Sequence, residues 1–67
     1  MTDRETYIVE NSEDAMELVR LGSLTKKQAD RAVQIADENF EEWKHLGVVE
    51  RLDLACDLVD LEMNTRA

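Results

Sequence analysis

The sequence predicts an all-α protein: a single small domain of three helices after an extended N-terminal arm, which forms a homodimer. Its 67 residues include no proline and only two glycines, and apolar residues recur at helical spacing between those glycines. A hydrophobic content of 43% is ordinary for a globular protein and too high for a disordered one. A chain this short buries only ~60% of its unfolded surface, and its single cysteine excludes a disulfide framework. A second subunit is therefore the expected source of additional stability.

The longest predicted helix covers residues 26–46, about 30 Å at ~1.5 Å per residue. Thr25 and Gln28 have the spacing of a capping box at its start, and Gly47 is suited to its C-terminal end. One side of this helix carries an apolar stripe that is small at its start and bulky at its end. Its members are Ala29, Ala32, Val33, Ala36, Phe40 and Trp43. We expect this stripe to form the core.

Two further helices are predicted over residues 13–21, ending at Gly22, and over residues 48–63. The first of these is too short to be stable alone, so it must pack against the rest of the chain. Residues 1–11 lack helical periodicity, and residues 6–9 are β-branched or aromatic, which favours an extended backbone. We therefore expect residues 1–11 to form an extended arm.

The charge is strongly acidic, with 16 acidic against eight basic residues and a formal net charge of −8. Such a charge repels nucleic acid and anionic membranes at long range and attracts basic protein surfaces. No apolar run is long enough to cross a membrane, and the N-terminal residues lack the pattern of a signal peptide. We expect a cytoplasmic protein, in line with its single cysteine.

The helix over residues 48–63 carries two outward features beside its apolar core face. We call the first, a stripe of carboxylates ~80° wide on a helical wheel, the acidic row. It consists of Glu50, Asp53, Asp57 and Asp60. The second is the leucine strip: Leu54, Leu58 and Leu61. A three-helix monomer would leave this strip exposed, so we expect it to be an oligomer interface. On the longest helix, Asp30, Asp37 and Glu41 face away from the apolar stripe, and we expect them to extend the partner-binding surface.

These features indicate a non-catalytic protein that binds a basic surface of a partner protein and inhibits or modulates it. A row of carboxylates can imitate the spacing of phosphates and occupy a basic groove. In composition and size the chain resembles small acidic inhibitors of DNA-handling proteins, many of them encoded by phages. That resemblance implies a nucleic-acid-binding protein as partner. Two simpler roles remain open: a structural helical subunit that docks through the leucine strip, and an acidic row that serves solubility alone.

A third alternative is a DNA-binding helix-turn-helix. The turn at residues 21–25 is followed by basic and polar side chains where a reading helix contacts bases. These are Lys26, Lys27, Gln28 and Arg31, with Arg20 nearby. The net charge of −8 opposes this interpretation, because the acidic residues would lie close to the phosphates.

No pattern indicates catalysis, a cofactor or a metal site. Glu42 and His45 have the Glu-x-x-His spacing of di-iron bundles, but they point away from the core stripe, whereas such ligands point inward. Cys56 has only acidic neighbours on its helix, whereas a catalytic thiolate needs positive charge nearby. With two glycines there is no phosphate-binding loop. We therefore expect no enzymatic activity.

Overall fold

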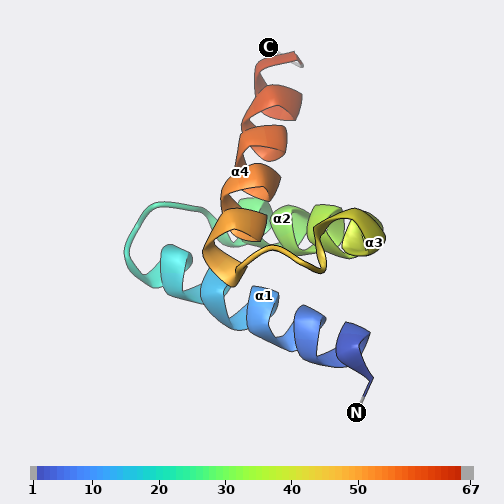
Figure 1. Ribbon diagram of the computed structural model, residues 1–67. Helices are drawn as coiled ribbons and strands as arrows, with labels where there is room; N and C mark the ends of the chain where they lie inside the picture. Colours follow the sequence, from blue (N-terminus) through green and yellow to red (C-terminus); the bar gives the residue numbers. More distant parts are fainter. Residues whose placement is uncertain (1, 66–67) are drawn as a thin grey trace.

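A computed structural model describes residues 2–65, and all of its regular structure is helical, as predicted. The elements are α1 (Asp3–Arg20), α2 (Lys26–Glu38), α3 (Phe40–Trp43) and α4 (Val48–Thr65). In Figure 1, α1 and α2 run in opposite directions, and α4 crosses them steeply. In Figure 1 the C-terminal half of α4 extends above the other helices, and it contacts α2 through the buried Val59 and through Glu62, which binds Arg31. Along most of its length α4 is therefore packed on one face, and its opposite face is left uncovered within residues 2–65.

The first helix begins ten residues before its predicted start, at Asp3 rather than residue 13. Thr2 caps it with a capping box: its hydroxyl accepts from the Glu5 N–H at 3.2 Å, and its own N–H donates to the Glu5 carboxylate at 3.3 Å. The extended arm predicted for residues 1–11 is thus wrong for residues 3–11, while Met1 lies outside the described residues.

Burial explains why this segment is helical despite its β-branched residues. Tyr7, Asn11 and Ala15 follow at intervals of four and are all buried, so they form one face of a helix. The Tyr7 ring meets the Phe40 ring edge-on, with 4.8 Å between centroids, and its hydroxyl donates to the Ala36 carbonyl at 3.2 Å. Contacts made across the fold therefore outweigh the local preference for an extended backbone.

The core lies where α1, α2 and α4 meet. The buried apolar residues are Tyr7, Ala15, Ala29, Ala32, Ile35, Ala36, Phe40, Leu52, Ala55 and Val59. The predicted stripe is confirmed at its three alanines and at Phe40, whereas Val33 and Trp43 are only half-buried. Ile35, placed outside the stripe by the helical wheel, is buried instead.

A break at Asn39 divides the helix predicted over residues 26–46. The Asn39 side-chain amide donates to the Ile35 carbonyl at 2.9 Å, and its backbone leaves helical geometry (φ −104°, ψ 19°). The same Ile35 carbonyl still accepts the Asn39 backbone N–H at 3.1 Å, so the side-chain bond adds to the end of α2. The helix α2 ends at Glu38, and α3 has only four residues. The bulky end of the stripe consequently follows a new axis, which leaves Trp43 at the edge of the core.

Both predicted boundaries around the first turn are close to those observed. Gly22 adopts a left-handed conformation (φ 81°) just after α1, which suits a glycine. The capping box at the start of α2 is confirmed, with Thr25–Gln28 bonds of 3.2 and 2.9 Å. The last long helix begins at Val48, as predicted, and extends two residues beyond residue 63.

Arg51 attaches the base of α4 to the rest of the fold. The residue is only 5% exposed, and its guanidinium donates to the Glu10 carboxylate at 3.1 Å and to the Leu46 carbonyl at 3.2 Å. These bonds join α4 to α1 and to the loop that precedes α4. They fix the rotation of α4 about its own axis, and with it the direction in which the outer face points.

Candidate protein-binding surface

The acidic row lies on the outer face of α4. Ala55 and Val59 are buried on the inner face, and at ~100° per residue the row lies roughly opposite them. All four carboxylates are exposed, and across residues 2–65 none of them forms an ion pair. The row is therefore a free, uncompensated negative surface in the described part of the chain.

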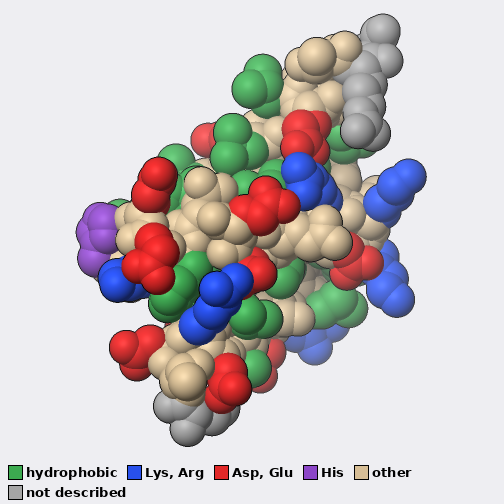
Figure 2. Space-filling model, turned by 90° about the vertical axis from the view of Figure 1, so that its right-hand side faces the viewer, with side chains coloured by type: hydrophobic (Ala, Val, Ile, Leu, Met, Phe, Trp, Pro, Cys, Tyr) green, Lys and Arg blue, Asp and Glu red, His purple; other side chains and the backbone are tan. Residues whose placement is uncertain are grey.

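The leucine strip runs along α4 directly beside the acidic row. Leu54 is 40% exposed, Leu58 38% and Leu61 61%, which is unusual for three leucines on one side of a helix. Figure 2 shows hydrophobic side chains exposed on the upper part of the molecule, which α4 forms, with acidic and basic side chains beside them. The free face of α4 thus combines apolar surface with negative charge.

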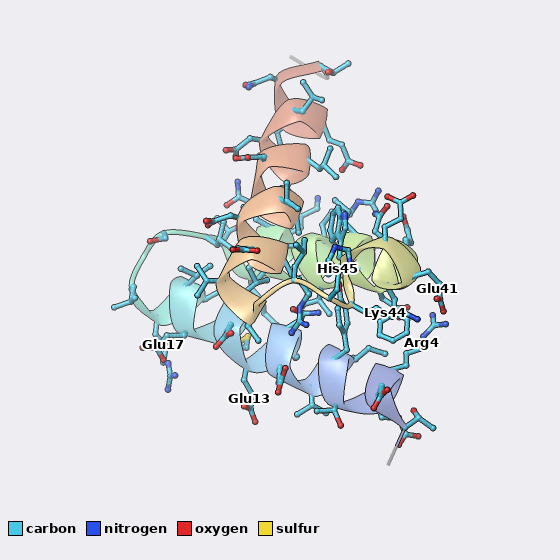
Figure 3. The ribbon with its side chains drawn as sticks, in the orientation of Figure 1. Arg4, Glu13, Glu17, Glu41, Lys44 and His45 are labelled. Carbon is cyan, nitrogen blue, oxygen red and sulfur yellow. The ribbon has the colours of Figure 1, made fainter. Side chains whose placement is uncertain are left out.

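The structure does not bring the other predicted acidic residues to this face. Asp37 pairs with Arg4 of α1 at 2.9 Å, and Glu41 pairs with Lys44 at 3.2 Å. In Figure 3, Arg4, Glu41 and Lys44 lie together at the outer end of α3, away from α4. Asp30 is exposed but lies where α2 faces α4, on the side of α4 opposite the row. The candidate surface is therefore confined to α4.

A notch of about 500 Å³ lies between the start of α2 and the distal half of α4. Val59 and Met63 line it from α4, and Gln28 and Arg31 line it from α2. Arg31 donates to the Glu62 carboxylate at 2.7 Å and so ties the two helices across the notch. This notch was not foreseen from the sequence, because it depends on the steep crossing of the two helices.

The basic residues of the helix-turn-helix alternative are only partly available. Lys26 and Lys27 are exposed at the start of α2, but Arg31 is paired with Glu62 and Glu38. Arg20 is paired with Glu17 on α1. A reading helix needs such side chains free for bases and phosphates, so these ion pairs weigh against DNA binding.

The residues considered for metal binding and catalysis lie on α3, on α4 and in the loop between them. Glu42 and His45 are both exposed, His45 in the loop between α3 and α4. Nowhere in residues 2–65 do three His, Cys, Asp or Glu side chains converge as metal ligands would. Cys56 is half-buried, and burial, followed by the carboxylates of Asp53, Asp60 and Asp57, raises the pKa of its thiol. A raised pKa makes the thiol a weak nucleophile at neutral pH.

Comparison with known proteins adds no relative to this description. Neither the protein families, nor the curated proteins, nor the solved structures gave a match to this chain. Within residues 2–65, the helices are too short or too polar to cross a lipid bilayer.

Proposed function

We propose that this protein is a non-catalytic binding module whose acidic α4 face docks on a basic surface of a partner protein and blocks or modulates it. A nucleic-acid-binding protein is the partner class that fits best, because its basic groove already accepts a row of negative charges. The observation that carries the proposal is the acidic row, exposed and without ion pairs in the described residues.

The energetics of the row support a role outside folding. Carboxylates three and four residues apart on one helix repel each other and cost a few tenths of a kcal/mol per pair. In residues 2–65 six other acidic side chains form ion pairs, among them Asp37 with Arg4, Glu10 with Arg51 and Glu62 with Arg31. The row of α4 has no such partner among the described residues. A binding function gives this repulsion a use, since clustered charge speeds encounter with a basic surface and rejects acidic competitors.

The test is a pull-down from the native host with the parent and with Asp53→Lys/Asp57→Lys, at low and moderate salt. Both positions are exposed, so the variant should keep its helical circular dichroism and melt at the same or a slightly higher temperature. We expect it to lose the partners that the parent captures. Capture by the parent should itself weaken steeply with salt.

A matched control is Glu13→Lys/Glu42→Lys, which changes the net charge by the same amount at two other exposed positions. Glu13 projects from α1 on the side away from α4 (Figure 3). This control should capture partners as the parent does. If both variants recover the parent's partners in equal amounts, the acidic row is a solvated surface and the proposal is wrong.

The exposed leucine strip favours one second candidate, a structural subunit that docks on another chain through apolar contacts. Salt separates the two functions. Binding through the leucines alone would be insensitive to salt and would survive Asp53→Lys/Asp57→Lys, whereas Leu58→Gln would abolish it.

A further inference from the structure

We propose, building on the function above, that the element recognised by α4 is a basic amphipathic helix on the partner protein. The leucine strip is the docking face, and it packs against apolar residues of that helix. The carboxylates that flank the strip pair with Lys or Arg beside those apolar residues.

The spacing of the strip is that of a helix–helix seam. Leu54, Leu58 and Leu61 follow at intervals of four and three, which are the d, a and d positions of a heptad. Amphipathic helices commonly present anchors of this spacing to another helix or to a hydrophobic groove. The exposed seam does not extend toward the N-terminal end of α4, because Arg51 occupies the preceding a position and is buried in the fold. The free seam is therefore short, and it lies on the outer side of α4, away from the buried Ala55 and Val59.

Charge beside the seam selects the kind of partner. Glu50 and Asp57 occupy the flanking g positions on the solvent side, and both are exposed without an ion pair in residues 2–65. On the inner flank lie Ala55, which is buried, and Glu62, which pairs with Arg31. Flanking positions set partner choice in paired helices, so an acidic flank predicts Lys or Arg on the facing helix.

The same charges disfavour a second copy of this chain as the occupant. In a parallel pair the g positions of one helix face the e positions of the other, and in an antiparallel pair they face each other's g positions. Both arrangements bring acidic side chains of the two copies together on chains of net charge −8. A basic helix turns each of these repulsive contacts into an ion pair.

The experiment measures binding of three synthetic helical peptides by titration calorimetry. The probe carries leucine at a and d and lysine at the flanking positions. One control replaces the leucines by serine, and the other replaces the lysines by glutamate. We expect the probe to bind the parent about tenfold or more tightly than either control. Leu58→Gln, which keeps helix propensity, should remove that advantage.

A pair of charge variants separates a helix seam from general negative charge. Glu50→Gln/Asp57→Asn removes the two flanking charges, while Asp53→Asn/Asp60→Asn removes two charges farther from the strip. If the seam forms, the first pair weakens binding of the probe several times more than the second. Equal losses would contradict the seam.

Failure of this inference is distinct from failure of the proposed function. If the serine control binds as tightly as the probe, or if the probe does not bind, the helix inference is overturned, while the pull-down still decides the function. If the glutamate control binds as tightly as the probe, the strip does not select a basic helix and the inference is overturned. The inference is also overturned if the parent sediments as a dimer that Leu58→Gln dissociates, because the strip is then occupied by a second copy of this chain.

Discussion

The guanidinium of Arg51 lies 4.1 Å from the centre of the Tyr7 ring and joins α4 to α1 in the middle of the fold. A cation over an aromatic face is stabilised most when water is excluded, and both side chains are almost completely buried. Because Arg51 belongs to the same helix as the acidic row, this contact also determines which face of α4 remains free.

Arg51→Ala should therefore lower the free energy of unfolding by about 3 kcal/mol, through the lost ring contact and the lost bond to Glu10. Urea titration followed by circular dichroism measures this change. Arg20→Ala is the matched control, since Arg20 is exposed and its one ion pair within residues 2–65 is with Glu17. It should change stability by about 0.5 kcal/mol or less. Equal losses in the two variants would show that the buried guanidinium has no special role.

Phe40→Ala should cost about 3–5 kcal/mol, because Phe40 is buried and meets Tyr7 edge-on. Trp43→Ala should cost clearly less, since Trp43 packs only at the edge of the same cluster. Chemical denaturation of both variants tests this order. A larger loss for Trp43→Ala would mean that the helix does not break at Asn39 and that the apolar stripe continues through residue 43.

The two glycines should respond differently to alanine. Gly22→Ala should cost about 1 kcal/mol, because alanine is strained at φ 81° even though no atom lies within 4 Å of the added carbon. Gly47→Ala has equal space and no positive φ, so it should be neutral or stabilise by up to ~1 kcal/mol through the unfolded chain. Thermal unfolding of the two variants measures this difference. A larger loss of stability for Gly47→Ala than for Gly22→Ala would contradict the observed turn.

Stability should fall at alkaline pH in part because of Tyr7, the only tyrosine. Burial raises the pKa of its hydroxyl above the ordinary 10.0, and Arg51 opposes part of that rise. The unfolded chain then loses this proton first, so the contribution is intact below pH 10.0 and disappears as the pH rises through the folded pKa.

Tyr7→Phe isolates this contribution, since it removes the ionisable hydroxyl and leaves every other titrating group in place. The variant should be about 1 kcal/mol less stable at neutral pH, through loss of the bond to Ala36, but should show a shallower alkaline decline. Parallel declines in the two proteins would rule out the linkage.

Features encoded by neighbouring residues could be predicted, and features that need distant residues could not. The start of α2 was found because Thr25 and Gln28 are three residues apart. The same spacing is present at Thr2 and Glu5 and could have indicated a helix start, but the prediction for residues 1–11 followed only the β-branched run. The break at Asn39 interrupts an otherwise regular helical pattern, and the apolar periodicity of the sequence carries no signal of it.

The same distinction separates the features of the candidate surface that could be predicted from those that could not. The exposure of the acidic row and of the leucine strip follows from the periodicity of a single helix, so the sequence was sufficient. Asp37 and Glu41 were predicted to lie on the partner-binding surface, whereas in the structure each forms an ion pair away from the acidic row. The Asp37 pair requires Arg4 on a helical α1, and the Glu41 pair requires the α3 turn after the break. The burial of Arg51 was also beyond reach, because its partner Glu10 lies 41 residues earlier in the chain.

Hydroxyl-radical footprinting of the protein bound to a captured partner tests most directly whether α4 is the binding surface. Leu54, Leu58 and Leu61 should lose reactivity in the complex, because they are exposed in the free protein. Met16, which is 42% exposed on α1, should keep its reactivity and serves as the internal control. Protection of Met16 with the three leucines unchanged would contradict a binding face on α4.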